Sequence, residues 1–246
     1  LHEKLKINYE LYYVDNDREL RRLYPDLNFF EAPLVTSEAY NDFIKRLIDT
    51  YRIEFYLPLI DEEIISSKKT FDGYNGVVVI SPTLAFSTLC LNKFDLMKEL
   101  KRLNISYIKS YLGDDLDWNG KDVIFVKPIS GRGSRGIKKI TSKEQLAAYY
   151  ILEDYKPEEV LVQEYIEGAE YTIGATVNNL IQLLAISVKK VIRKKGITQI
   201  AVMEHHPFLN DVVKSVVNLL KPCGPINIQL YLTANSEVKI FEIKSQ

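Results

Sequence analysis

The strongest chemical signal in the sequence is a lysine followed closely by a glycine-rich segment. Lys127 closes an apolar run, and the segment after it has glycines at G-x-G-x-x-G spacing among serines and arginines: Ser130, Gly131, Gly133, Ser134, Arg135 and Gly136. Glycine lets backbone N–H groups approach phosphate oxygens closely, and a lysine at a strand end supplies a compact positive charge. The following residues, 137–140, read as a strand, which favours a hairpin over phosphates rather than a dinucleotide-binding turn. An ordinary tight hairpin is the alternative.

Two other phosphate-binding patterns are excluded. No Gly-Lys-Ser/Thr follows the glycines, so the segment is not a Walker loop. No His-Arg-Asp and no Asp-Phe-Gly occurs, so the chain is not a protein kinase.

A second signal is a strand end followed by a turn and a glutamate. The strand ends with Gln163, Glu164, Tyr165 and Ile166, Gly168 turns the chain, and Glu170 starts the return strand. The backbone of the first four residues can pair with the edge of an adenine, and Glu170 can accept hydrogen bonds from ribose hydroxyl groups. A plain hairpin with a solvated glutamate is the alternative.

A third signal is a set of oxygen-bearing side chains within two apolar strands near the end of the chain. Asn227 and Gln229 face the same side of one strand because side chains alternate, and Glu242 can lie opposite Gln229 on the next. Amide and carboxylate oxygens suit Mg²⁺. The alternative is the polar outer face of a two-stranded ribbon.

The remaining polar residues give weaker signals. The basic run 189–195 is typical of a solvated hairpin. His205 and His206 precede a proline at a helix start and are expected to be solvated or capping residues. Cys90 and Cys223 are far apart in apolar surroundings, which favours buried thiols in a reducing cytosol over a disulfide.

The elements that must position these residues divide the chain in two. The first part alternates strands with helices, as in a parallel doubly wound sheet; strands are expected at 10–14, 53–57, 76–80 and 105–109, and helices at 36–51, 61–70 and 93–103. The second part reads as α+β; strands are expected at 123–127, 137–140, 159–166, 170–178, 180–188, 225–232 and 238–243, and helices at 141–153 and 208–220. The last helix is expected to bury Phe208, Val212, Val216 and Leu219.

Composition excludes several classes of protein. A net charge of −1 over 246 residues provides no general field for nucleic acid or an anionic membrane. No apolar run is long enough to cross a bilayer. We therefore expect a cytoplasmic protein with small-molecule partners.

In order and spacing, the three signals resemble the ATP-grasp superfamily, in particular the branch of the carbamoyl-phosphate synthetase large chain. The resemblance implies a Rossmann-like pre-ATP-grasp domain over residues 1–112, with its first strand missing and 93–103 as a connecting helix. An ATP-grasp domain over 113–246, incomplete at its C-terminal end, follows. Asp15 and the run 58–62 fit the first domain.

The resemblance also implies roles for individual residues. Lys93 and Lys127 would contact phosphates, residues 130–136 would form the loop over them, and 163–166 with Glu170 would hold adenosine. Gln229 and Glu242 would bind Mg²⁺ or Mn²⁺. Lys189 (or the adjacent Lys190) and Arg135 would act at the γ-phosphate or on the acid substrate.

The implied activity is an ATP-dependent ligase that joins a carboxylic acid to an amine or thiol through an acyl phosphate; a homodimer is compatible with the sequence. One residue departs from the pattern, because Lys244 stands where the family's metal motif usually has asparagine. An ammonium group has no lone pair for a metal. A nucleotide-binding protein without ligase activity is therefore the alternative, and a phosphotransferase that stops at the phosphorylated acid is a third.

Overall fold

The computed structural model describes residues 9–130 and 136–245, which form two compact units. The first comprises the described residues up to Tyr56 together with Ser66–Val79, and the second comprises Leu57–Ile65 together with the described residues from Ile80 onward. The units divide near residue 80, because the helices that follow it pack into the core of the second unit, and the domain boundary at 112 stays a prediction.

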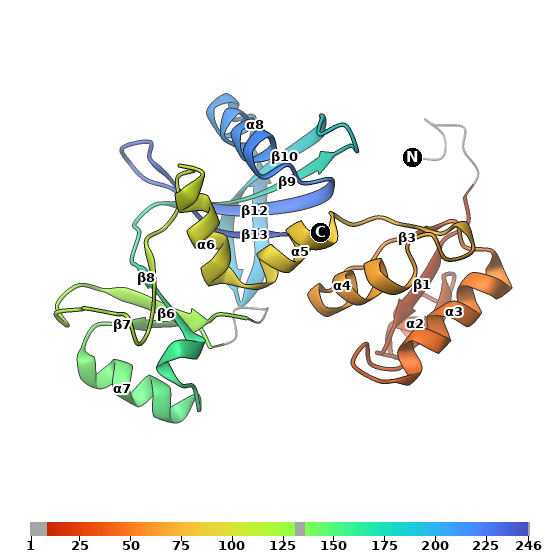
Figure 1. The fold of residues 1–246 in the computed structure, drawn as a ribbon, viewed down its shortest axis with the longest axis horizontal. Helices are drawn as coiled ribbons and strands as arrows, with labels where there is room; N and C mark the ends of the chain where they lie inside the picture. Colours follow the sequence, from red (N-terminus) through yellow and green to blue (C-terminus); the bar gives the residue numbers. More distant parts are fainter. Residues whose placement is uncertain (1–8, 131–135, 246) are drawn as a thin grey trace. The chain divides into compact units, whose positions relative to one another are not determined.

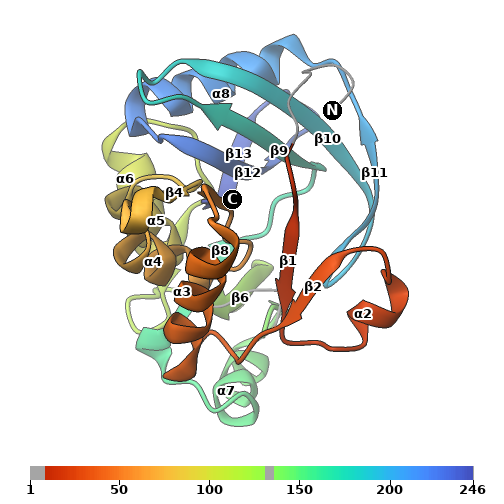
Figure 2. The ribbon, with the colours of Figure 1, turned by 90° about the vertical axis from the view of Figure 1, so that its right-hand side faces the viewer.

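The first unit contains two short parallel strand pairs with a helix packed beside them (Figure 2). Its elements are β1 (Tyr12–Asp15), α2 (Leu20–Leu23), β2 (Asn28–Glu31), α3 (Ala39–Tyr51), β3 (Phe55–Tyr56), η1 (Tyr74–Gly76) and β4 (Val78–Val79), with the end of α4 (Asp61–Thr70). Helix α3 buries Tyr40, Ile44 and Ile48, which lie on one face at helical spacing.

The alternation of strands and helices in this unit agrees with the prediction, but the strands do not form the single parallel sheet that was predicted. The pairs β1–β2 and β3–β4 are separate two-stranded sheets among the described residues, and β2 and α2 were not expected. The Rossmann-like identity of this unit stays a prediction.

The second unit contains a four-stranded and a five-stranded sheet (Figure 1). The smaller has the order β5-β8-β6-β7, from β5 (Ser110–Leu112), β6 (Ile124–Pro128), β7 (Lys138–Ile140) and β8 (Val160–Glu164). Between β7 and β8 lie α7 (Lys143–Leu152) and η2 (Pro157–Glu159). Helix α7 begins at Ser142, whose side chain accepts a hydrogen bond from the Gln145 backbone, and packs Tyr149 into the core of this sheet.

The larger sheet has the order β11-β10-β9-β12-β13. Its strands are β9 (Ala169–Val177), β10 (Leu183–Lys195), β11 (Ile197–Met203), β12 (Gly224–Leu232) and β13 (Val238–Lys244), and it shares one apolar core with α5 (Leu84–Leu91), α6 (Lys93–Arg102) and α8 (Pro207–Leu220).

Two expectations for this part of the chain are wrong in whole or in part, and two elements were not expected. The predicted strand 105–109 is represented only by a bridge from Tyr107 to Ile240, and the strand that follows, β5, pairs with β8. Helix α5 was missed because it is apolar all round and shows no periodicity. Strand β11 was not expected; the chain turns at Gly196, whose φ is +73°, and folds back on β10. Helix α8 buries Leu209, Val213, Val216 and Val217, while Phe208 and Leu219 are exposed.

Candidate functional site

A cavity of about 610 Å³ in the second unit brings several of the predicted site residues together. It is lined from β6 and β8 of the smaller sheet, from all five strands of the larger sheet, and from the start of α6. Six predicted residues line it: Lys93, Lys127, Gln163, Glu170, Gln229 and Glu242. Its volume lies within the range of ~300–1,000 Å³ that is usual for small-molecule sites.

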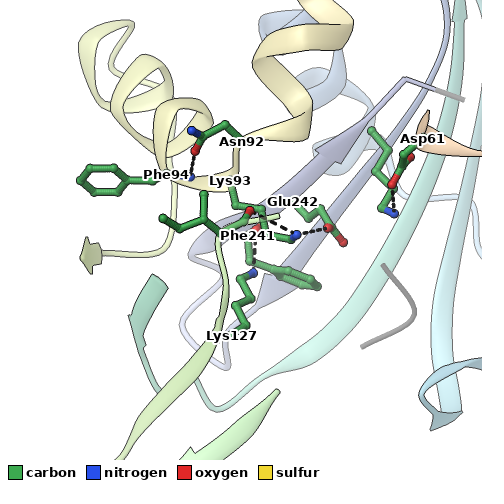
Figure 3. A network of polar contacts seen from close by, with 9 residues as sticks. Asp61, Asn92, Lys93, Phe94, Lys127, Phe241 and Glu242 are labelled. Atoms are coloured by element: carbon green, nitrogen blue, oxygen red, sulfur yellow. Dashed lines mark hydrogen bonds and ion pairs between the residues drawn. The ribbon is translucent and has the colours of Figure 1, made fainter. Parts of the chain in front are cut away.

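Lys93 and Lys127 are two of the lysines that line this cavity (Figure 3). Lys93 opens α6, whose first backbone N–H groups are capped by the Asn92 side chain at 3.0 and 3.1 Å. The Lys93 ammonium lies 3.9 Å from Glu242 Oε1. The Lys127 ammonium donates a hydrogen bond to the Phe241 carbonyl at 3.4 Å. Two lysines from distant segments thus converge on consecutive residues of β13.

Burial destabilises both charges. Desolvation lowers the pKa of Lys127 from 10.5 to about 8, although nearby Glu242 acts in the opposite direction. Desolvation also lowers the pKa of Lys93, again against the attraction of Glu242. Keeping two ammonium groups in a low-dielectric site is costly, and an anionic ligand between them would offset that cost.

Gln229 and Glu242 are directly opposed on β12 and β13, as predicted. Both line the cavity, and so does Asn227, whose Oδ1 accepts a hydrogen bond from Thr172 Oγ1 at 3.1 Å. No group of three or more His, Cys, Asp or Glu side chains able to hold a metal occurs among the described residues. A divalent cation at the Gln229–Glu242 pair would therefore need further oxygens from a ligand or from water.

Lys244 makes an ion pair instead of presenting an amide oxygen. Its ammonium lies 3.2 Å from Asp61 Oδ2, and both side chains are largely shielded from solvent. Asp61 opens α4 and belongs to the same compact unit as Lys244. The positive charge of Lys244 is thus held next to Glu242 by a carboxylate far away in the sequence.

Glu170 is paired with a lysine that the sequence analysis missed. Lys194 Nζ lies 2.6 Å from Glu170 Oε1, and both residues line the cavity. Lys194 belongs to the basic run 189–195, which the sequence analysis interpreted as a solvated hairpin. Strand β10 continues beyond Lys190, where its pairing with β9 ends, and this extension contains Lys194. Lys189 is exposed and is not among the described residues that line the cavity, and Lys190 lies 4.0 Å from Glu204.

Of the four residues 163–166, only Gln163 is among the described lining residues. Its buried side chain donates a hydrogen bond to Ser110 Oγ at 2.8 Å. The Glu164 N–H donates to the Lys109 carbonyl, and the Lys109 N–H donates to the Glu164 carboxylate. Tyr165 stacks at a tilt on Phe125, and Ile166 packs against the core of the larger sheet.

The glycine-rich segment is described only at its ends. Gly131, Gly133, Ser134 and Arg135 lie outside the described residues. Gly136 has a φ of +70°, which glycine adopts without strain. Ser130 lines a second, smaller cavity that shares Lys93, Glu242 and Lys244 with the larger one.

The weaker candidates are structural. His206 caps α8, since its Nδ1 accepts a hydrogen bond from the Leu209 N–H. Cys90 is buried and desolvation raises the pKa of its thiol, whereas Cys223 is partly exposed with Sγ 2.9 Å from Asn179 Oδ1. Neither thiol is in a disulfide. None of the described helices is long and apolar enough to cross a membrane.

Comparison with known proteins identifies the class. Residues 90–243 match the family model of the ATP-grasp domain, so the chain belongs to the ATP-grasp family, as its sequence motifs suggested. A curated relative is the D-alanine–D-alanine ligase of Aquifex aeolicus (strain VF5), which is 35% identical over 81 residues. That alignment covers 33% of this chain and 26% of the ligase.

Solved structures agree with the fold. Biotin carboxylase from Campylobacter jejuni, in complex with β,γ-ATP, matches with a TM-score of 0.77 and 12% identity, over 100% of this chain and 61% of the other. The biotin carboxylase domain of Hydrogenobacter thermophilus 2-oxoglutarate carboxylase matches with a TM-score of 0.75 and 12% identity, over 100% of this chain and 60% of the other. The latter structure is a dimer that contains MgADP and bicarbonate. This chain thus spans about three fifths of both proteins.

Proposed function

We propose that the protein is an ATP-dependent ligase that joins a carboxylic acid to an amine. One observation carries the proposal: Lys93, Lys127, Glu170, Gln229 and Glu242, which come from five separate segments, line one cavity. The ATP-grasp assignment and the ligase relative support it.

The proposed reaction has two steps. A carboxylate oxygen of the acid attacks the γ-phosphorus of ATP, the bond to the β–γ bridging oxygen breaks, and ADP leaves. The amine nitrogen then attacks the carbonyl carbon of the acyl phosphate, inorganic phosphate leaves with the C–O electron pair, and a proton is released. A thiol could replace the amine. Positioning and neutralisation of charge supply most of the acceleration in such phosphoryl transfers.

The residues of the chain divide this work between them. Lys93 and Lys127 hold the phosphates by charge, and Glu170 accepts hydrogen bonds from the ribose once Lys194 releases it. The roles expected for the segment 130–136 and for Arg135 stay predictions, and residues 163–166 meet the adenine. Lys194, and not Lys189, is the lysine of β10 that lines the cavity.

The donor set at Gln229 and Glu242 fits Mg²⁺, and Mn²⁺ has the same preference for oxygen. Such a cation supplies charge neutralisation at the phosphates. Because Lys244 is held by Asp61, we propose one protein-bound cation at this pair, with the ammonium contributing charge beside it.

A second candidate function is nucleotide binding without ligase activity. The Lys244–Asp61 ion pair favours it, because it fills the place where the family usually has a metal-binding asparagine.

Two measurements separate the candidates. Calorimetry with ATP and Mg²⁺ tests nucleotide binding, and ADP release is then measured with a panel of carboxylic acids and hydroxylamine as the nucleophile. Hydroxamate formation supports activation of the acid as an acyl phosphate, the step that the second candidate lacks. ATP binding without turnover in any mixture supports the second candidate. A Lys127→Ala variant that keeps both ATP binding and turnover argues against this site.

A further inference from the structure

Four charged side chains form two ion pairs at the smaller cavity, of about 210 Å³, which all four line. The Lys93 ammonium lies 3.9 Å from Glu242 (Figure 3), and the Lys244 ammonium lies 3.2 Å from Asp61. Each of these side chains is at most 18% exposed, so water screens their charges only weakly. Two positive and two negative charges cancel, and each lysine is paired with a different carboxylate.

The geometry of β13 permits another arrangement of these pairs. Glu242 and Lys244 are two residues apart on this strand, so their side chains leave the same face about 7 Å apart. Lysine has a long, flexible stem that can reach a carboxylate two positions away. The part of the chain that the structure describes nevertheless contains no ion pair between Lys244 and Glu242, because Lys244 is paired with Asp61.

An ion pair between Lys244 and Glu242 would conflict with cation binding. Glu242 already has the ammonium group of Lys93 at 3.9 Å. A second ammonium group at the same carboxylate would occupy lone pairs that a metal needs and would leave a net positive charge beside the metal. The Lys244–Asp61 pair avoids both effects, since Asp61 neutralises Lys244 and provides it with another acceptor.

The Lys244–Asp61 pair belongs to the same electrostatic cluster as Glu242. Desolvation lowers the pKa of Lys93, and Glu242 raises it; of the two remaining charges, Lys244 lowers this pKa and Asp61 raises it. Among the described residues, Lys244 lines both cavities, whereas Asp61 lines only the smaller one. Asp61 therefore binds the ammonium group from the side of the smaller cavity, away from the groups assigned to the nucleotide.

We propose that Asp61 is a positioning residue for the cation site: it keeps the Lys244 ammonium from pairing with Glu242, and so leaves that carboxylate free for the divalent cation that binds with ATP. Asp61 touches neither the cation nor the nucleotide and acts only through Lys244. The inference rests on the proposed function, because it assumes a divalent cation at Gln229 and Glu242. It accounts for how a lysine stands next to a metal-binding carboxylate without displacing the metal.

The test measures what the cation adds to the affinity for ATP. Calorimetry with ATP and Mg²⁺, and separately with ATP and EDTA, gives two Kd values, and their ratio is the enhancement by Mg²⁺. In Asp61→Asn we expect this enhancement to fall about tenfold or more, because the released ammonium group pairs with Glu242. The Kd for ATP in EDTA should not rise, since the variant has one negative charge fewer near the phosphates. General damage to the site would instead weaken binding under both conditions.

Two further variants test whether Asp61 acts through the lysine. In Lys244→Met the enhancement by Mg²⁺ should not fall below the wild-type value, because no ammonium group competes for Glu242. In the double variant Asp61→Asn/Lys244→Met we expect the enhancement to return to within about threefold of the wild type, for the same reason. The double variant removes both charges of the pair together, so it also tests the inference if Asp61→Asn alone does not fold.

Glu63→Gln is the matched control for Asp61→Asn. Glu63 lies in the same first turn of α4, but its Oε2 accepts a hydrogen bond from the Leu59 N–H, and it is not among the described lining residues of either cavity. We expect the enhancement by Mg²⁺ in this variant to stay within about twofold of the wild type.

The outcomes distinguish this inference from the proposed function. If ATP binds under neither condition, both fail. If the wild type binds ATP but Asp61→Asn leaves the enhancement by Mg²⁺ unchanged, nucleotide binding stands and the inference is overturned. An enhancement as low in the double variant as in Asp61→Asn would also overturn it, because Asp61 would then act on the cation without Lys244. Equal effects of Asp61→Asn and Glu63→Gln would overturn it too.

Discussion

Replacing the buried Lys127 with methionine should abolish ATP binding and at the same time stabilise the empty protein. Methionine has nearly the length of lysine and no charge, so it fills the space without the cost of desolvation. Lys127 is 6% exposed, which makes this cost large. Residues that bind charged ligands often lower stability in this way.

The magnitude follows from the pKa of Lys127, which burial lowers from 10.5 to about 8. At about 1.4 kcal/mol per pH unit, keeping the group charged at pH 7 costs about 3 kcal/mol of folding free energy. The variant also loses the hydrogen bond to the Phe241 carbonyl, worth about 1 kcal/mol. The expected net gain in the free energy of unfolding is about 2 kcal/mol at pH 7.

The gain should depend on pH with a definite sign. Between pH 8 and 10.5 the unfolded chain keeps the Lys127 proton that the folded protein has lost, so the wild type becomes more stable relative to the variant as pH rises. Near pH 10.5 the cost of the charge has vanished, and only the missing hydrogen bond remains. The variant should then be about 1 kcal/mol less stable than the wild type.

Urea unfolding of both proteins at pH 7, 9 and 10.5 measures this difference, and calorimetry at pH 7 measures ATP binding. Lys139→Met is the control, because Lys139 is exposed on β7. We expect this variant to differ from the wild type by no more than about 0.5 kcal/mol in the free energy of unfolding at each pH. A Lys127→Met protein that is less stable at pH 7, shows no trend with pH, or binds ATP normally would refute the reasoning.

Three further predictions concern the cation pair and the core. Glu242→Gln should raise the Mg²⁺ concentration needed for ATP binding about tenfold or more, measured by calorimetric titration, because a neutral amide replaces the carboxylate. Leu209→Ala should lower the free energy of unfolding by about 2–5 kcal/mol, because Leu209 is fully buried. Leu219→Ala should change it by less than about 1 kcal/mol, because Leu219 is 44% exposed. Gly224→Ala should cost about 1–3 kcal/mol in the same urea assay, since its φ is +111° and the new Cβ would lie 2.8 Å from the Pro82 nitrogen.

Local sequence patterns predicted the elements that carry one clear periodicity. Helix α3 shows a single apolar face, and the strand pair β12–β13 alternates strictly enough to place Gln229 opposite Glu242. Where apolar residues surround an element, periodicity does not select a face. Helix α5 is such an element, whereas α8 has one clear apolar face, and the predicted set began one residue early, at Phe208 instead of Leu209.

The site was predicted as far as its residues lie in recognisable motifs. Lys93, Lys127 and Glu170 were found in this way, and they line one cavity. Lys194 and Asp61 were not found, because each acts through a partner distant in sequence: Glu170 for the first and Lys244 for the second. Such pairs depend on tertiary structure and leave no local trace.

The Glu170–Lys194 ion pair makes the larger cavity electrically polarised along its length. At the Glu170 end the two opposite charges cancel, whereas the other charged lining residues are three lysines, Lys93, Lys127 and Lys244, and a single carboxylate, Glu242. An elongated molecule with an anionic tail and an uncharged head is therefore attracted in one orientation and not in the reverse. The field thus orients an incoming nucleotide before any contact with its base is made.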